Sequence, residues 1–357
     1  MRILIDIGHP AHVHYFRNFI THMITNGHSI KVTARDKEMT FELLNRYGIE
    51  FNSRGKGSKI FIMKILYMPI AYYRIYKVAR KFKPDLFLSY SSPYAALVSK
   101  LFRRPNITLD DTEHSKYELL FYRYFSDAFL NPNSYYKFLG NKQIKFDSVM
   151  HLSYLHQKYY TPNIDVLKWM NIGVDEPYAI VRFVAWNANH DLGIVGLSRE
   201  NKILLIDRLI NAGIKVFISS ETELPLELKK YQIPFPAERL HDALFFAKVY
   251  IGEGATTASE SAILGTPAIY VNPLLMGYIE DEIKAGLVYH ATDINEILRI
   301  LSIILKNNDS DERYYFLKEK FIATKIDLTS FLIWFIENWS DSFRVMKEIP
   351  NFQYNFR

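Results

Sequence analysis

Residue types suited to holding a phosphate group cluster between Val249 and Pro273. The apolar start of this segment predicts a buried strand, after which Gly252 and Gly254 let the backbone turn tightly and approach a ligand. A helix beginning here would direct unpaired N–H groups and the positive end of its dipole at an anion. The pattern predicts an anion site, although such turns also occur in α/β proteins without a ligand there.

Hydroxyl and carboxylate groups follow this turn at helical spacing. Thr256 and Thr257 would stand in the first turn of the helix, and Glu260 roughly one turn further along. A carboxylate in that place can accept two hydrogen bonds from a ribose diol. Gly265 and Pro267 would end the helix. The segment therefore predicts a nucleotide-binding site.

Histidines dominate the loop after the first predicted strand, from Gly8 to Tyr15. An imidazole that titrates near neutral pH can remove the proton from an acceptor hydroxyl. His12 is the first candidate for this base, and His9 and His14 are its neighbours in the loop. Two other roles stay open: ligation of a metal by the three histidines, and capping of the following helix by one of them.

A second group of titratable residues, Asp110 to His114, follows another predicted strand. Asp111, Glu113 and His114 could position an acceptor or share a proton, whereas helix capping alone would explain one aspartate and Thr112. Both interpretations stay open.

Polar residues also end the strands predicted in the second half. Arg182 could reach a phosphate as a fixed cation, Ser219 closes the next strand, and His241 could face the nucleotide. The loop after Arg182 adds further polar candidates: Trp186, Asn187, Asn189 and His190.

The elements that would position these residues alternate along the chain. Apolar β-branched runs separated by longer amphipathic segments predict parallel sheets with crossover helices. The expected strands are 2–7, 29–34, 86–90, 106–109, 128–131, 178–183, 215–219, 249–251 and 268–271. We expect two doubly wound, Rossmann-like domains that face each other across a cleft, with ligands at the carboxyl ends of the strands. The expected boundaries are 1–160, 161–320 and a helical segment, 321–357, that could pack on the first domain.

Composition narrows the class of protein. A chain of 357 residues with 49% hydrophobic and 23% charged residues is typical of a soluble globular protein of two domains. The absence of cysteine excludes disulfides and thiolate chemistry and fits a reducing cytoplasm. Asp6 interrupts the apolar start before a signal peptide could form, and no apolar run approaches the roughly 20 residues of a membrane span.

Charge is distributed unevenly. Residues 1–150 carry 23 Lys and Arg against 12 Asp and Glu, so an anionic partner is expected there. A nucleic acid is disfavoured because no Lys/Arg run, zinc pattern or RNA-binding aromatic signature is present.

From Phe51 to Pro84 the chain has nine basic residues and no acidic residue, interleaved with apolar and aromatic residues. Such a segment predicts contact with an anionic membrane surface, although a helix pair with a solvated basic face has the same periodicity.

The segment from Val249 to Pro273 resembles the nucleotide-binding part of GT-B glycosyltransferases that use UDP-sugars. The nearest resemblances are to the N-acetylglucosaminyltransferase that completes lipid II and to the non-hydrolysing UDP-N-acetylglucosamine 2-epimerases. The histidine loop and Asp110 to His114 also resemble a GT-B-like family of unknown function in archaea and bacteria.

These resemblances imply roles for single residues. Gly254, Ala255, Thr256 and Thr257 would meet the diphosphate and Glu260 the ribose, while His12 falls on the histidine of the lipid II enzyme. The 2-epimerases place acids where Asp110 to His114 stands. The resulting expectation is a glycosyltransferase that moves a sugar from a UDP-sugar to a glycan or lipid-linked acceptor at the cytoplasmic face of the membrane, without a metal or other cofactor. The alternatives are a UDP-sugar 2-epimerase and a non-catalytic nucleotide-sugar binder.

Overall fold

The chain folds into two compact units. The structure, a computed structural model, describes residues 1–357 apart from 58–60, 115, 185–195, 222 and 307–309. The first unit comprises Met1–Tyr159 together with Lys325–Arg357, and the second comprises Tyr160–Thr324. The sequence placed the boundaries at 160 and 320.

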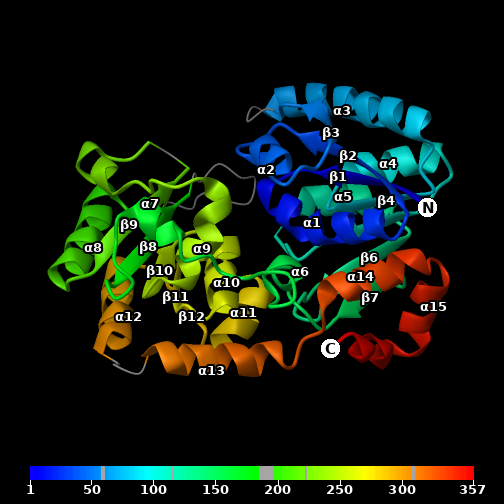
Figure 1. Ribbon diagram of the computed structural model, residues 1–357. Helices are drawn as coiled ribbons and strands as arrows, with labels where there is room; N and C mark the ends of the chain where they lie inside the picture. Colours follow the sequence, from blue (N-terminus) through cyan, green and yellow to red (C-terminus); the bar gives the residue numbers. More distant parts are fainter. Residues whose placement is uncertain (58–60, 115, 185–195, 222, 307–309) are drawn as a thin grey trace. The chain divides into compact units, whose positions relative to one another are not determined.

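The first unit is built on a parallel sheet. In the described part of the chain this sheet has seven strands in the order β3-β2-β1-β4-β5-β6-β7, so the chain winds outward from β1 in both directions (Figure 1). The strands are β1 Arg2–Ile7, β2 Ser29–Arg35, β3 Phe51–Gly55, β4 Leu86–Tyr90, β5 Asn106–Leu109, β6 Ala128–Pro132 and β7 Gln143–Phe146.

Helices connect these strands and cover the sheet, as expected for parallel strands that are apolar on both faces. They are α1 Pro10–Thr25, α2 Thr40–Arg46, α3 Phe61–Phe82, α4 Pro93–Leu101, α5 Lys116–Arg123 and α6 Leu152–Leu155, with α14 Leu328–Glu337, α15 Asp341–Glu348 and the 3-10 helix η3 Pro350–Phe356 from the end of the chain.

The second unit repeats the architecture with a smaller sheet, ordered β12-β11-β10-β8-β9 (Figure 1). Its strands are β8 Tyr178–Phe183, β9 Lys215–Ser220, β10 Val249–Gly252, β11 Ala268–Val271 and β12 Val288–Ala291. Its helices are α7 Val166–Met170, α8 Arg199–Asn211, α9 Leu240–Phe245, α10 Ala255–Leu264, α11 Gly277–Lys284, α12 Ile294–Lys306 and α13 Ser310–Ile322, with the 3-10 helices η1 Leu226–Tyr231 and η2 Ala237–Arg239. The prediction of α/β architecture with doubly wound parallel sheets is confirmed.

All nine strands expected from the sequence are present, but three others were missed: β3, β7 and β12. Each of these lies at an edge of its sheet. Edge strands contact a neighbour on one side only and carry more polar residues, as in the Phe-Asn-Ser-Arg-Gly sequence of β3. Their apolar pattern was therefore too weak to detect.

The end of the chain belongs to the first unit. The Ile326 N–H donates to the Asp147 carbonyl at 2.9 Å, and the Thr329 hydroxyl donates to the Ser153 carbonyl at 2.8 Å. Helix α14 packs against α1 and α6. Residues 325–357 thus add α14, α15 and the 3-10 helix η3 to a unit whose other residues lie far earlier in the sequence.

Candidate functional site

The predicted anion site of the second unit lies at the carboxyl end of β10, the middle strand of its sheet. Gly254 is the residue before α10 and has extended backbone angles, and in the described part of the chain no side chain caps this helix. Ala255 and Thr256 therefore offer first-turn N–H groups to a ligand. Thr257 is buried beside them.

Gly252 has no room for a side chain. A Cβ at this position would lie 2.3 Å from the Tyr250 hydroxyl and 2.9 Å from the Arg182 carbonyl, and both distances are shorter than real contacts. Glycine is required because two strands and a tyrosine meet here, so packing alone accounts for this glycine.

Arg182 lies beside the beginning of α10, where its Nε is 3.7 Å from the Cβ position of Gly254. Its Nη1 donates to the Ser219 hydroxyl at 2.7 Å, and its Nη2 pairs with Glu221 at 2.7 Å. These two partners fix the guanidinium next to the helix amides. Arg182 and Ser219, both named as candidates from the sequence, are thus brought together near the beginning of α10.

Glu260 and His241 form a buried pair. The Nε2 of His241 lies 2.9 Å from Oε1 of Glu260, and both side chains are about 95% buried. Glu260 stands on α10 and His241 on α9, and the two helices pack together. The carboxylate is therefore held in place, which lowers the entropic cost of ordering it for any interaction with a ligand.

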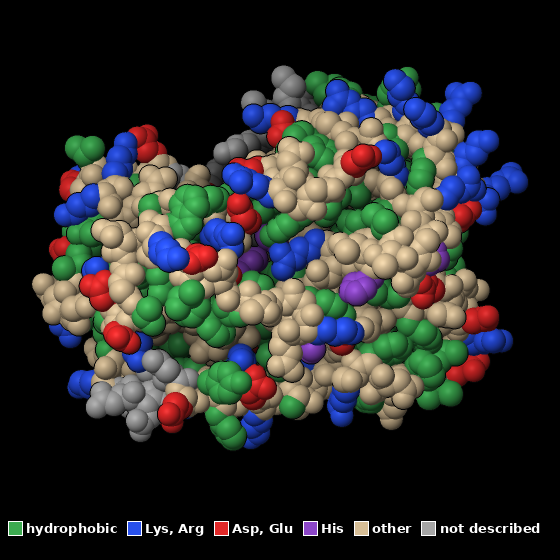
Figure 2. Space-filling model, viewed as in Figure 1, with side chains coloured by type: hydrophobic (Ala, Val, Ile, Leu, Met, Phe, Trp, Pro, Cys, Tyr) green, Lys and Arg blue, Asp and Glu red, His purple; other side chains and the backbone are tan. Residues whose placement is uncertain are grey.

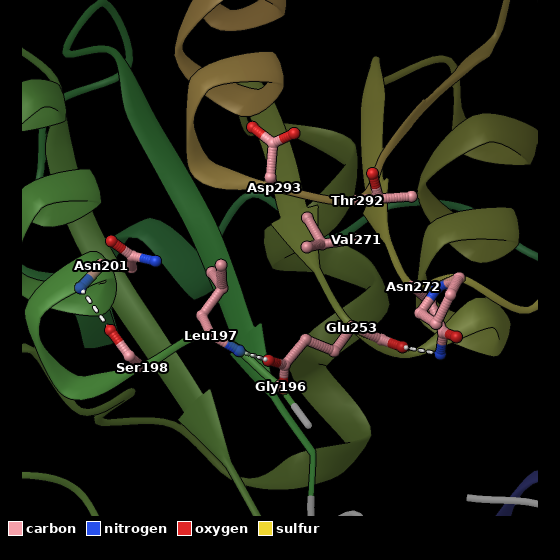
Figure 3. A pocket seen from close by; sticks show the side chains of 10 residues that line it. Gly196, Leu197, Ser198, Asn201, Glu253, Val271, Asn272, Thr292 and Asp293 are labelled. Carbon is pink, nitrogen blue, oxygen red and sulfur yellow. Dashed lines mark hydrogen bonds between the residues drawn. The ribbon is translucent and has the colours of Figure 1, made fainter. Parts of the chain in front are cut away.

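A cavity of about 240 Å³ opens at the carboxyl ends of β10, β11 and β12. Figure 3 shows Glu253 in its wall, where one carboxylate oxygen accepts the Leu197 N–H at 2.9 Å and the backbone carbonyl accepts an N–H of Asn272 at 3.1 Å. The other carboxylate oxygen accepts the Val184 N–H at 3.0 Å. Since ligand pockets typically measure about 300–1,000 Å³, this cavity can enclose only part of a nucleotide sugar.

The histidine loop of the first unit links β1 to α1. His9 caps α1, because its Nδ1 accepts the Ala11 N–H at 3.2 Å. His14 is buried, stacks on Tyr154 and lies 3.2 Å from the Tyr47 hydroxyl. His9 thus performs the capping left open from the sequence, whereas His14 packs against two tyrosines. Among the described residues, no group of three or more His, Asp or Glu side chains could hold a metal ion.

His12 is half-buried, as is His9, whereas His14 is buried. The Gly8 N–H donates to its Nδ1 at 3.3 Å, which leaves the proton of the neutral ring on Nε2. Burial, with further contributions from the positive charges of Lys37 and Arg54, lowers the pKa of His12 to about 3. At neutral pH the ring is therefore an uncharged N–H donor.

The pKa of Asp111 is shifted upward, whereas that of His12 is shifted downward. Burial is the main cause that raises the pKa of its carboxyl group to about 7, and the nearby carboxyl of Asp110 adds to the effect. The Tyr90 hydroxyl donates to Oδ1 of Asp111, and the Asp111 N–H donates to the same hydroxyl at 3.0 Å. The Tyr90 ring lies 4.4 Å from the ring of His12. His12, Tyr90 and Asp111 therefore form one contiguous group.

The other members of the acidic cluster have different surroundings. Asp110 accepts hydrogen bonds from the Tyr122 and Tyr135 hydroxyls and from the Thr112 N–H, so it organises the loop. Glu113 is buried, and its backbone carbonyl accepts a hydrogen bond from Lys137. His114 is half-buried. The geometry favours Asp111 as the member suited to proton transfer.

Three residues were not identified as candidates from the sequence. Tyr90 and Arg54 lie near His12 in the first unit, and Glu253 lines the cavity of the second unit. Tyr90 and Arg54 acquire their roles from partners far away in the chain. Glu253 stands between the two glycines of the turn, and that position was a usable signal. Of the candidates in the loop after Arg182, Trp186, Asn187, Asn189 and His190 lie outside the described residues.

Comparison with known proteins places the chain in a family. A family model described as a protein of unknown function, DUF354, matches residues 1–326. An uncharacterized protein of Methanocaldococcus jannaschii is 24% identical over 307 residues, which cover 83% of this chain and 89% of that protein.

Solved structures share the fold. The S. aureus MnaA structure with UDP has a TM-score of 0.69 at 13% identity, covering 96% of this chain and 97% of that one. The UDP-GlcNAc 2-epimerase of Neisseria meningitidis bound to UDP-GlcNAc has a TM-score of 0.63 at 12% identity, and the match covers 88% of this chain and 94% of that one. The spinosyn rhamnosyltransferase SpnG with spinosyn aglycone has a TM-score of 0.61 at 12% identity, and the match covers 95% of this chain and 100% of that one. The fold is therefore GT-B-like, as predicted.

Proposed function

The chain belongs to the DUF354 family of proteins of unknown function, and we propose that it is a metal-independent glycosyltransferase that moves a sugar from a UDP-sugar to an acceptor hydroxyl. The observation that carries this proposal is the buried carboxyl group of Asp111, whose pKa is raised to about 7, in contact through Tyr90 with His12. A carboxyl group with a pKa near 7 is suited to general base catalysis at neutral pH.

The donor would bind to the second unit. The first-turn amides of α10 and the fixed guanidinium of Arg182 suit a diphosphate, and the carboxylate of Glu260 suits a ribose diol. UDP and UDP-GlcNAc are bound in two structures that share this fold, which supports a uridine nucleotide as the donor carrier.

The proposed reaction needs one proton transfer. The acceptor hydroxyl gives its proton to the Asp111 carboxylate as its oxygen forms a bond to the anomeric carbon. The bond from that carbon to the diphosphate breaks, and UDP leaves with the electron pair. The α10 amides and Arg182 stabilise the charge on UDP, and the Nε2–H of His12 orients the acceptor oxygen. This assigns proton removal to Asp111, whereas the sequence favoured His12.

A 2-epimerase is the second candidate. Two features favour it: the fold is shared with named UDP-GlcNAc 2-epimerases, and several carboxyl groups lie together after β5. An epimerase would use the same donor site without an acceptor.

Helix α3 supports an acceptor at an anionic membrane surface. Leu66, Ile70 and Tyr73 are exposed on one face of this helix, and the same face continues with the exposed bases Lys77 and Arg80. Figure 2 shows Lys and Arg side chains gathered where Figure 1 places α3. Apolar side chains beside bases suit the headgroup region of an anionic leaflet. Of the helices that the structure describes, none is long and apolar enough to cross a membrane.

Incubation with a panel of nucleotide sugars tests the proposal. A transferase should release UDP faster when an acceptor extract is added, and the sugar nucleotide that remains should be unchanged. Conversion of UDP-GlcNAc to its 2-epimer without an acceptor would replace the proposal by the second candidate. If no nucleotide sugar binds or reacts, both are wrong.

A further inference from the structure

Cationic side chains converge at the carboxyl ends of β2 and β3, next to His12. Arg35 ends β2, Lys37 follows it, and Arg54 stands near the end of β3. The charges of Lys37 and Arg54 both act on His12, and those of Arg35 and Arg54 both act on Tyr94. The cluster formed by Arg35, Lys37 and Arg54 therefore borders the proposed acceptor position.

Arg54 is built into the unit as a fixed cation, with only 3% of its surface exposed. Its Nε lies 3.0 Å from Asp6 Oδ1, its Nη1 donates to the Tyr67 hydroxyl at 3.3 Å, and its guanidinium carbon lies 4.7 Å from the centre of the Tyr94 ring. These contacts leave Nη2 directed toward the loop after β1, 3.2 Å from the Cβ position of Gly8. The same Cβ position lies 3.8 Å from His12 Cε1. One N–H of Arg54 is thus presented beside the catalytic group.

Arg35 is the unneutralised member of the cluster. Among the described residues no carboxylate lies within ion-pair distance of its guanidinium, and its buried Nε has no hydrogen-bond acceptor. The acids closest in sequence are Asp36 and Glu38, and Glu38 pairs with Lys37 at 3.3 Å. A buried N–H without an acceptor destabilises the folded protein, so an anion that accepts a hydrogen bond from Arg35 would stabilise it.

Glycine positions allow this arrangement. A Cβ at Gly57 would lie 2.3 Å from Nη2 of Arg35 and 2.5 Å from its Nε, so only a glycine lets the guanidinium lie against the backbone here. Gly55 has a positive φ of 97° and similarly accommodates Arg74, whose Nη1 would lie 2.2 Å from a Cβ at that position. Because Gly55 and Gly57 have no side chains, the guanidinium groups of Arg74 and Arg35 can both lie against the backbone of this turn.

We propose that Arg35 and Arg54 bind an oxyanion, a phosphate or a carboxylate, carried by the acceptor. Asp6 compensates Arg54 alone, which leaves the excess positive charge on Arg35 for the ligand. Arginine donates two parallel hydrogen bonds to such a group, and these bonds would fix the acceptor hydroxyl next to His12 and Asp111. The assignment of the anion to an acceptor rests on the proposed function, whereas binding of the anion to this cluster does not.

Thermal denaturation of the full chain in the presence of inorganic phosphate tests this site, because a ligand of the folded state raises the melting temperature with its concentration. The background is Arg182→Ala, so that the anion site of the second unit contributes little. Arg35→Ala and Gly57→Ala should each raise the phosphate concentration needed for half of the stabilisation by about tenfold, the effect of one charged hydrogen bond. Gly57→Ala keeps every charge and only displaces the guanidinium. Arg123→Ala, which removes an exposed arginine of the same unit, is the matched control.

All titrations are made at the same ionic strength, which is set with chloride. If the melting temperature depends on phosphate concentration equally in Arg35→Ala, Gly57→Ala and the control, the proposal is wrong. A parallel titration with acetate identifies the group: the anion that stabilises at the lower concentration is the chemistry of the acceptor. Failure of the proposed function gives a different result, because a chain that binds no nucleotide sugar would still lose phosphate binding in Arg35→Ala.

Discussion

The two units use the same element, the turn from a parallel strand into a helix, in different ways. In the first unit the turn after β1 is closed by a side chain, since His9 caps α1. In the second unit no described side chain caps α10, so its amides stay available. A capped helix end has fewer N–H groups to offer an anion. The capped turn suits an acceptor, and the uncapped turn suits a diphosphate.

Charge is also handled differently in the two sites. In the second unit the ionisable groups are paired before a ligand binds, as in Arg182 with Glu221 and His241 with Glu260. In the first unit the Asp111 carboxyl is buried among hydroxyl groups, and its pKa is raised to about 7. Pairing fixes geometry for binding, whereas an elevated pKa prepares a group for proton transfer. The proposed function uses this difference, with chemistry in the first unit and donor binding in the second.

Asp111→Asn gives the largest expected effect. Loss of the carboxylate should lower turnover by about 10²-fold or more, the range for a general base, while UDP binding stays unchanged. Steady-state kinetics and calorimetry measure the two quantities. Asp341→Asn, at an exposed aspartate of the same unit, should change neither. A large loss of UDP affinity in Asp111→Asn would contradict the separation of roles.

The pH dependence sharpens the same prediction. A base must be ionised, so kcat/KM should rise with pH to a plateau above about 7, the raised pKa of Asp111. Because this carboxyl holds its proton more tightly when folded than when unfolded, its contribution to the free energy of unfolding should fall as pH rises from about 4 to 7. Asp111→Asn should remove both dependences, which pH–rate profiles and urea titrations would reveal.

His12 gives the next largest effect. His12→Ala should lower turnover by about 10²-fold with little change in nucleotide affinity. His12→Gln, which restores an N–H donor but not a base, should regain part of this loss if the ring acts through its Nε2–H. Equal activity of the Ala and Gln variants would favour His12 as the base. Unchanged turnover in both would remove His12 from the mechanism.

Glu260→Ala should weaken UDP binding by about 1–3 kcal/mol, the range for a lost hydrogen bond to a charged group. Turnover at saturating donor should change much less, because the residue belongs to the binding site. The variant also deprives His241 of its buried partner, so its melting temperature must be compared with that of Glu227→Ala, an exposed control in the same unit. UDP binding as tight as in the unchanged protein would refute the ribose assignment.

Helix α3 gives the smallest effect per residue. Replacement of Lys77, Arg80 and Lys81 by glutamate should weaken sedimentation with phosphatidylglycerol vesicles, since each base near an anionic leaflet contributes about 1 kcal/mol. The same charge change at Lys168, Lys215 and Lys229, exposed lysines of the second unit, should have little effect. Absence of vesicle binding at low salt would favour a soluble acceptor.

The sequence predicted the fold and which residues lie together at the beginning of α10, but it did not predict the surroundings of His12 and Asp111, for a physical reason. Gly252, Gly254 and Glu260 lie within one short segment, so the residue types that suggest this site can be recognised from neighbouring positions in the sequence. The pKa of Asp111 is raised mainly by burial and also by the carboxyl group of Asp110. The pKa of His12 is lowered mainly by burial, with further contributions from Lys37 and Arg54. Sequence spacing carries no information about contacts between different strands, so the electrostatics of the first unit required the structure.

Residues 325–357 complete the first unit, so this unit is split in sequence whereas the second is continuous. During synthesis, domains tend to fold as units when all of their chain has emerged. The second unit can therefore reach its native state on the ribosome, but the first must wait with α1 and α6 uncovered until α14 is made. A chain cut before α14 would expose the apolar surface of α1 and α6 that α14 covers, and would therefore be more prone to aggregation and proteolysis.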